Sequence, residues 1–370
     1  MAIKIQGTTI ISDNAGGNSV DFGQCALANN TTGTFNVAMG RNALLSNTTG
    51  SCNIAIGYAA MCQSTTGQRN VAVGMNSLYA NTWGNCNVAL GQNTLLSNTT
   101  GPRNTALGNA SMASNYTGGN NVALGHVALC TNTFGNNNVA LGAFSLDGNT
   151  NGSYNVAVGS NALGNNTTGS YNTAIGNSSL QSNSTGCCNV ALGASSHAFN
   201  TSGNFNTVIG PAAGNNLSTG SCNTVIGYQA TASTSSVSNE FTLGSTNITN
   251  LRCNDTSISS LSDERDKDNI QDLDWGVDFI QSMRPVKFDW NRRDGSMAGK
   301  KDMGFIAQEL DLIEAQYQSH EYTRLVHKEN PDRWEADPMK TYPILIKAVQ
   351  EIADKIDALK QRIGILESSG

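Results

Sequence analysis

The sequence predicts a mainly β protein: a parallel β-solenoid of fourteen 17-residue coils, followed by a smaller α+β domain that ends in a coiled coil. Three observations support this fold class. A pentapeptide of the form Asn-x-Ala-x-Gly recurs once in every coil, the charged residues gather after position 250, and the apolar residues after Pro343 follow heptad spacing. We therefore expect an N-terminal segment 1–18, a repeat domain 19–256, a junction 257–261 and a C-terminal domain 262–370.

The spacing of the repeat never changes. Degenerate copies at Ser19–Gly23 and Glu240–Gly244 extend the pattern in register, so thirteen full repeats separate Gly23 from Gly244 without an insertion or deletion. Fixed repetition of this kind predicts stacked coils, each stabilised by its neighbours, and it overrides local propensity. The clear copies begin at Asn36, Asn53, Asn70, Asn87, Asn104, Asn121, Asn138, Asn155, Asn172, Asn189, Asn206 and Asn223.

Each position of the pentapeptide has an expected role. Alternation along a strand puts the Asn and the Ala on one face and the β-branched and large aliphatic residues on the other. Ala is the expected interior residue, and the Asn column predicts an amide ladder along the stack. The Gly that closes every copy indicates a positive φ or a close approach to a neighbour. A second apolar column follows at Leu27, Leu44, Met61, Leu78, Leu95 and Met112, and then comes a polar turn such as Asn47–Gly50.

A coil with so much Ala inside has a thin core, and three stacks packed side by side would bury more surface. The pattern Asn-x-Ala-[Ile/Leu]-Gly resembles the head repeats of trimeric autotransporter adhesins, which implies a trimeric β-roll. It is also similar to repeats of some algal-virus attachment proteins. We therefore expect a homotrimer.

Charge is distributed unevenly along the chain. Residues 1–250 are neutral overall, so the net charge of -6 lies in 251–370, and no basic face is expected to bind nucleic acid. No apolar run is long enough for membrane insertion and no secretion signal is recognisable, which predicts synthesis in a cytoplasm. The charged residues of 1–250 are Lys4, Arg41, Arg69, Arg103, Asp13, Asp21, Asp147 and Glu240.

The cysteines are expected to be stacked small apolar residues and not disulfides. Cys52, Cys86, Cys188 and Cys222 share one column of the repeat and Cys62 and Cys130 another, so same-column neighbours lie at least two coils apart, about 9–10 Å, beyond bridging distance. No CxxC pair indicates a metal, and no cofactor is expected.

Residues 1–18 predict a short strand and a turn at Asp13–Gly17. The opening resembles that of fibre proteins of phages that infect cyanobacteria, which implies attachment to other virion tail or baseplate proteins. The alternative is a cap on the first coil.

The C-terminal domain has helical and strand patterns. We expect a helix over Asp272–Met283, a strand over Val286–Trp290 and a strand-to-helix segment over Gly304–Leu310. A coiled coil is predicted over 344–367, and its composition favours three or four strands. Its seam consists of Leu345, Val349, Ile352, Ile356, Leu359, Ile363 and Leu366.

Four motifs in order carry a further resemblance: Leu261–Ile270, Arg284–Trp290, Gly304–Glu309 and the heptads. Together they resemble the endosialidase-type intramolecular chaperone (peptidase S74) of phage tail fibres and spikes, over residues 262–370. The resemblance implies a domain that trimerises, drives the upstream β-structure into a trimer and then cuts itself off. It also implies a Ser262/Lys267 dyad, supported by Asp263 and Arg265.

Elementary chemistry constrains that dyad. Lysine is almost fully protonated at neutral pH, so Lys267 can act as a base only if desolvation lowers its pKa, and burial in a trimer would supply this. Ser262 would then be the nucleophile, and cleavage is expected at the Ser262–Asp263 bond. The alternative is a charged linker in which Ser262 caps a helix.

Together these resemblances imply a viral tail fibre, located in the virion, that is expected to adsorb to a host cell-surface glycan or protein. One alternative is a polysaccharide-degrading spike, which normally needs two carboxylates within about 10 Å. The solenoid has only widely spaced acidic residues. Another alternative is a surface-adsorbing solenoid adhesin. The candidate receptor contacts are aromatic: Trp83, Tyr116, Phe134, Tyr154 and Tyr171.

Overall fold

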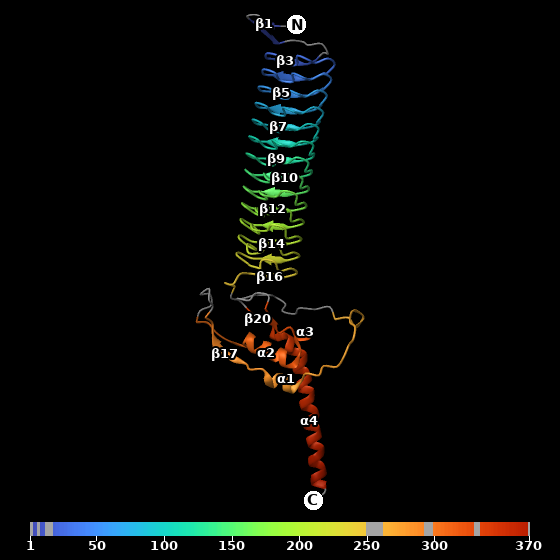
Figure 1. Cartoon of the computed structure of the whole chain (residues 1–370), viewed down its shortest axis with the longest axis vertical. Coiled ribbons are helices and arrows are strands. Elements are labelled where there is room, and N and C mark those ends of the chain that lie inside the picture. The colour runs from blue at the N-terminus through green and yellow to red at the C-terminus, as the bar shows by residue number, and fades with distance from the viewer. Residues whose placement is uncertain are drawn as a thin grey trace. The chain divides into compact units, whose positions relative to one another are not determined.

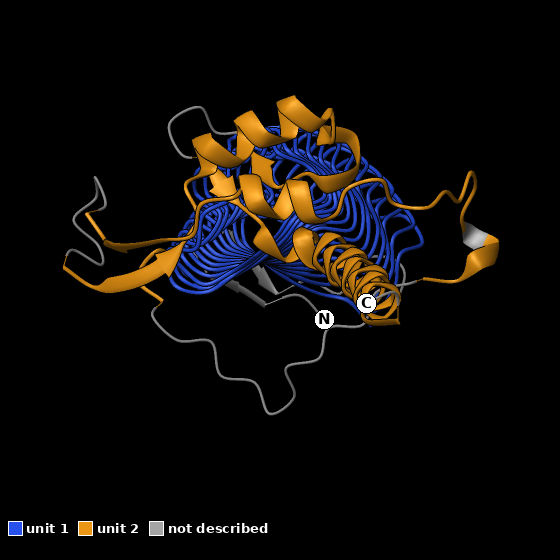
Figure 2. Ribbon diagram, turned by 90° about the horizontal axis from the view of Figure 1, so that it is seen from below, with its two compact units in different colours: residues 1–245 blue, residues 246–370 orange. Residues whose placement is uncertain are grey.

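A computed structural model describes residues 3–5, 8–11, 18–248, 262–291, 299–328 and 334–368. The chain divides into two compact units, Met1–Ser245 and Thr246–Gly370 (Figure 2), which are described separately. The predicted turn at Asp13–Gly17, the last residues of the predicted repeat domain and the junction 257–261 lie outside the described residues.

The first unit contains the predicted parallel β-solenoid. Fourteen strands form one parallel sheet in chain order, and each strand pairs with the strand one repeat further along the chain, as in Val37 with Ile54 (Figure 1). The fold class is therefore confirmed. The strands are β3 Val20–Phe22, β4 Val37–Met39, β5 Ile54–Ile56, β6 Val71–Val73, β7 Val88–Leu90, β8 Thr105–Leu107, β9 Val122–Leu124, β10 Val139–Leu141, β11 Val156–Val158, β12 Thr173–Ile175, β13 Val190–Leu192, β14 Thr207–Ile209, β15 Thr224–Ile226 and β16 Phe241–Leu243.

The faces of the strands are as predicted. The Ala of each clear copy that has one is fully buried, together with the second apolar column that contains Leu44 and Leu78. The residues on either side of the Ala point outward and are intermediate or exposed. We call the two outward positions of all these strands the apolar sheet face. Its members that are not apolar are Thr105, Thr173, Thr207 and Thr224.

The predicted amide ladder is present, but it is weaker at the expected column than at another one. At Asn36 and its equivalents the side-chain oxygen accepts a hydrogen bond from the backbone N–H of the next Asn, as in Asn53 N to Asn36 Oδ1 at 3.0 Å. Side-chain bonds between successive amides of this column, where they occur, are 3.0–3.2 Å long. Shorter ones, 2.7–2.9 Å, run through the turn column that contains Asn98 and Asn115.

The invariant Gly has both properties predicted for it, a positive φ and a close approach to the neighbouring coil. Gly40 has φ +135°, and a Cβ at that position would lie 2.4 Å from the carbonyl oxygen of Gly57 in the next coil. Three further positions in a typical coil have positive φ without being Gly, for example Asn42, Leu44 and Cys52. Such residues cost roughly 1–2 kcal/mol each, and the sequence pattern did not reveal them.

The core changes composition near the last coils. His197 replaces Leu in the buried apolar column, Leu217 replaces Asn in the turn column, and Val208 and Val225 replace Ala. These changes divide the apolar interior into a long cluster that ends at Ala191 and a short one that starts at Val208. Burial lowers the pKa of His197 to about 4.

The cysteine prediction was correct about pairing and wrong about burial. The described cysteines are free, but only Cys62 is buried, whereas Cys52, Cys86 and Cys222 are exposed at a bent corner with positive φ. Because that corner faces outward, these thiols are not part of the core. At the N-terminus the structure has two antiparallel strands, β1 Ile3–Ile5 and β2 Thr8–Ile11, where one was predicted.

The second unit combines small sheets with helices. Strand β17 Val286–Asp289 pairs with β18 Lys301–Gly304, and β19 Val326–His327 pairs with β20 Glu335–Ala336, both antiparallel. Phe279, Leu310, Ile313, Leu325 and Ile344 form its apolar core. The helices are η1 Glu264–Asp266, α1 Val277–Ser282, α2 Ala307–Tyr317, α3 His320–Thr323, η2 Pro338–Thr341 and α4 Tyr342–Ser368.

The helix predicted over Asp272–Met283 is shorter than expected. Helix α1 begins at Val277 because Gly276 brings the backbone against α4, where the Glu351 carboxylate accepts a hydrogen bond from the Val277 N–H at 2.9 Å. A Cβ on Gly276 would lie 2.2 Å from that carboxylate.

Helix α4 covers the predicted heptads without a break. Its first turns bury Ile344 and Ala348, while the seven seam residues from Leu345 to Leu366 are exposed in the single chain. The coiled coil itself stays a prediction. No helix in the described part of the chain is long and apolar enough to cross a membrane.

Candidate functional site

Ser262 and Lys267 lie in direct contact. The Lys267 Nζ donates a hydrogen bond to the Ser262 Oγ at 2.7 Å and another to the Ser262 carbonyl oxygen at 3.3 Å. The short helix η1 turns the chain between them, and the Lys267 N–H closes this turn on the Glu264 carbonyl. The predicted dyad therefore has hydrogen-bond geometry, which is the first requirement for a nucleophile and its base.

Asp263 and Arg265 hold the turn. The Asp263 carboxylate accepts from the Arg265 backbone N–H at 2.9 Å and from its guanidinium at 3.0 and 2.6 Å. These bonds with Arg265 keep the pKa of Asp263 below its usual range. Asp263 is thus the N-cap of η1, so the alternative in which Ser262 caps a helix is wrong, and the Ser262 hydroxyl is left to Lys267.

Both members of the dyad are exposed in the single chain. The arrangement supplies a hydroxyl for attack on a carbonyl carbon and an amine nearby to take its proton. It does not exclude water, whereas a lysine that acts as a base at neutral pH needs desolvation.

Two of the predicted motifs are joined by an ion pair. Arg284, which precedes β17, donates from Nε to a Glu309 carboxylate oxygen at 3.0 Å, and its Nη2 contacts the other oxygen. This two-point contact lowers the pKa of Glu309. It also links the residues before β17 to the first turn of α2.

A cluster of ionisable residues beside α2 was not predicted from the sequence. The buried Glu314 carboxylate accepts from Thr323 Oγ1 at 2.5 Å and from the Leu325 N–H at 2.6 Å, and His320 Nδ1 lies 3.2 Å from its other oxygen. Asp311, Glu314 and His320 lie close enough to share a cation, and the Lys328 ammonium, which contacts Asp311, supplies a positive charge there. We interpret the cluster as the structural link between α2, α3 and β19.

The aromatic candidates are all exposed, and the structure brings four of them together in pairs. Tyr154 and Tyr171 stack with centroids 4.9 Å apart and planes 4° apart. Tyr116 and Phe134 meet edge to face at 6.5 Å, and Trp83 stands alone with 66 % of its surface exposed. All five rings are thus exposed on an almost uncharged rod.

The comparisons with known proteins support one part of the chain. Residues 262–317 match the model of a peptidase S74 family described as chaperone of endosialidase, which implies an intramolecular chaperone of the self-cleaving kind. The match contains Ser262, Lys267, Arg284 and Glu309. Neither the curated proteins nor the solved structures gave a match.

Proposed function

We propose that this protein is a trimeric viral tail fibre that attaches to a host surface, and that its C-terminal unit directs trimerisation and then cuts the Ser262–Asp263 bond. The observation that carries the proposal is the 2.7 Å contact between Ser262 Oγ and Lys267 Nζ inside the family-matched segment. In this reading the fibre is made in the host cytoplasm and joins other virion proteins through residues 1–18.

The chemistry follows from that contact. When two further copies pack against the turn, water is displaced from Lys267 and its neutral form becomes accessible. Lys267 then takes the Ser262 proton as Oγ attacks the Ser262 carbonyl carbon of a neighbouring copy brought there by assembly. The intermediate collapses to an ester as the Asp263 amine of that copy leaves with the proton from Lys267, and water then hydrolyses the ester to leave a carboxylate on Ser262. Cleavage is thereby coupled to assembly, because the single chain leaves the dyad in water.

The apolar sheet face supports the trimer. A strip of three residues by fourteen strands covers roughly 650 Å², more than the apolar patch that a monomer normally exposes and close to the share of one partner in a standard interface. A partner has to match it layer by layer over the whole stack, which another copy of the same rod does. Independently, the exposed heptad seam of α4 favours association of parallel copies through a coiled coil.

The cleavage is tested by intact-mass measurement of purified protein. Wild type should give two masses, for residues 1–262 and 263–370, whereas Ser262→Ala should stay whole. Lys267→Arg is the matched control, because it keeps the positive charge but arginine does not lose its proton in proteins. An uncut wild type, or a cut that persists in Ser262→Ala, contradicts the mechanism.

The trimer is tested by light scattering and by resistance to heat in detergent. Leu124→Lys puts a charge in the middle of the apolar sheet face, where symmetry mates would bring three together, and it should abolish the resistant trimer. Ser114→Lys puts the same charge on an exposed turn of a neighbouring coil and should leave the trimer intact. Equal behaviour of the two variants would remove the sheet face from the interface.

The polysaccharide-degrading alternative is not favoured by the solenoid. Its acidic residues from β3 to β16 are Asp21, Asp147 and Glu240, separated by about seven and five coils, and glycoside hydrolysis normally needs two carboxyl groups within about 10 Å. Release of reducing sugar from host envelope by the purified fibre would reverse this conclusion.

A further inference from the structure

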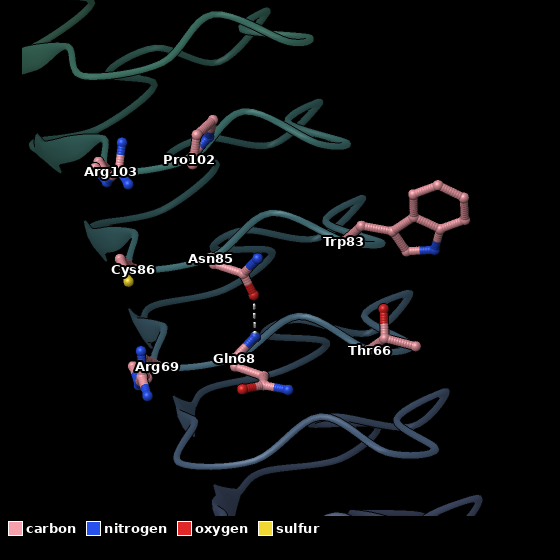
Figure 3. A pocket seen from close by; sticks show the side chains of 8 residues that line it. All are labelled: Thr66, Gln68, Arg69, Trp83, Asn85, Cys86, Pro102 and Arg103. Atoms are coloured by element: carbon pink, nitrogen blue, oxygen red, sulfur yellow. Dashed lines mark hydrogen bonds between the residues drawn. The ribbon is translucent and has the colours of Figure 1, made fainter.

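One side of the solenoid carries a groove lined by two arginines, Arg69 and Arg103, that make no ion pair within the described part of the rod. It crosses three coils, is open to solvent and has a volume of about 600 Å³, within the range of ligand sites. Figure 3 shows Arg69, Cys86 and Arg103 stacked in one column on successive coils, with Trp83 projecting from the other edge. The groove lies beside the strands, at the bent corner that precedes each Asn, and not on the apolar sheet face.

The two arginines are the main electrostatic feature of this part of the rod. No acidic residue occurs between Asp21 and Asp147 in the sequence. Neither guanidinium makes an ion pair within the described residues, and both side chains are exposed. Two coils separate them, about 10 Å along the stack. Their positive potential is therefore available to an anion from solution. The spacing of the two positive charges suits a chain that carries repeated negative charges.

The other lining groups favour a sugar chain. Asn85 uses its Oδ1 to accept from the Gln68 backbone N–H at 2.7 Å, which fixes its side chain and leaves its Nδ2 to donate outward. The Gln68 amide lies beside it, and together they offer donors and an acceptor for hydroxyl groups. Trp83 presents an apolar ring on which the C–H face of a pyranose can pack. Two charges over about 10 Å are too few for the phosphate neutralisation that holds nucleic acid.

We infer that this groove binds an anionic saccharide chain, with carboxylate groups held by Arg69 and Arg103 and a sugar ring packed against Trp83. The inference rests on the proposed attachment role and gives it a ligand class and a place on the rod. It requires no chemistry at the C-terminal unit. Binding should therefore be the same in cleaved and uncut protein.

The repeat itself offers well-matched variants. Arg69→Asn and Arg103→Asn introduce the residue that Asn120 and Asn137 supply in the same column, also at positive φ. Trp83→Thr restores the residue of Thr49 and Thr66 in its column. Arg41→Gln is the charge control, because it removes an arginine of a different column in which Gln24 and Gln92 occur.

The test measures binding of the purified protein, cleaved or uncut, to immobilised polygalacturonate at low salt, with fully methyl-esterified polygalacturonate and poly-L-glutamate as comparison surfaces. Wild type and Arg41→Gln should bind polygalacturonate alone. Each Arg→Asn change should weaken binding by about tenfold, as expected for loss of a charge-assisted hydrogen bond, and Trp83→Thr by about fivefold.

Three results would overturn the inference: no binding of wild type to polygalacturonate, equal binding to the methyl ester, or unchanged binding by the double arginine variant. Equal binding to poly-L-glutamate would assign the groove to acidic peptides instead. Intact mass and trimer content, measured on the same samples, report separately on the proposed assembly and cleavage. If the groove does not bind the saccharide, the proposed assembly and cleavage are unaffected. If cleavage does not occur, the groove is still judged by its own binding data.

Discussion

Ser64 interrupts the short amide ladder, and repairing it should stabilise the rod. In the turn column, Asn47 Nδ2 donates to Asn30 Oδ1 at 2.8 Å, and an unbroken run of such bonds leads from Asn81 to Asn200. Ser64 stands between the two runs. The Asn47 Oδ1 and the Ser64 Oγ are both buried and have no hydrogen-bond partner.

Ser64→Asn should complete the ladder. Asn at this position can donate to the Asn47 Oδ1 and to the Gly67 carbonyl, as the other members of the column do three residues ahead, and it can accept from the Asn81 Nδ2. Three hydrogen bonds form and two buried atoms without partners disappear. At about 1 kcal/mol net for each bond, less the cost of ordering a longer side chain, we expect a gain of about 2 kcal/mol per chain.

Calorimetry of the purified protein measures this gain. About 2 kcal/mol corresponds to a rise of roughly 4–8 °C in the melting temperature of a unit of this size. Ser64→Ala is the matched control, because it removes the unpaired hydroxyl without supplying a partner for Asn47, and it should recover only a small part. Asn132→Ser should introduce the same defect into an intact run and lower the melting temperature by a similar amount.

The ladder argument is refuted if Ser64→Asn melts no higher than Ser64→Ala, or if Asn132→Ser melts like wild type. Either result would mean that the turn column is held by its backbone bonds between coils, with the amides contributing nothing measurable. Hydrogen exchange of the amides near Ser64 gives a local check, since a repaired ladder should slow opening there first.

The remaining predictions concern other buried or strained positions. Because the pKa of buried His197 falls to about 4 while the unfolded chain takes up a proton near 6.5, stability should decrease by about 3 kcal/mol between pH 6.5 and 4 and then level off; His197→Leu should abolish that dependence in denaturant titrations at several pH values. Val127 is a β-branched residue at φ +59°, so Val127→Asn should raise the free energy of unfolding by about 1 kcal/mol, measured as a higher melting temperature. Gly276→Ala should push the α1 backbone away from Glu351 and cost about 1–3 kcal/mol, seen as earlier unfolding of the C-terminal unit.

The sequence predicted what periodicity controls. The constant repeat spacing was sufficient to predict the stacked parallel strands, the buried Ala and the close approach at Gly40, since each follows from repetition and strand alternation. It did not predict that Leu44 and Cys52 have positive φ, because neither residue type favours that conformation by itself. Those angles follow from bonds between coils, which a propensity argument on one coil does not contain.

The candidate site was predictable where its residues are close in sequence. Ser262 and Lys267 are near neighbours in the chain, so a single turn places them in contact, and the motif order was enough to select them. The roles of Glu351 and Glu314 were not predictable, because they depend on contacts across 74 and 11 residues that no local pattern encodes. Asp263 was expected only to support the motif, and its place as the N-cap of η1 appears once the turn is seen.

The backbone strain in each coil is consistent with a C-terminal chaperone unit that acts during folding and is removed afterwards. Positive φ at non-Gly positions costs each coil several kcal/mol, which is recovered only through hydrogen bonds to the coils above and below. The first coil to form has no such neighbour, so we expect nucleation to be the slow step. Once the stack exists, its hydrogen bonds lie within a coil or between adjacent coils, and those of the described residues from β3 to β16 have their partners in the rod itself. A unit that starts the stack can therefore be cut away without loosening it.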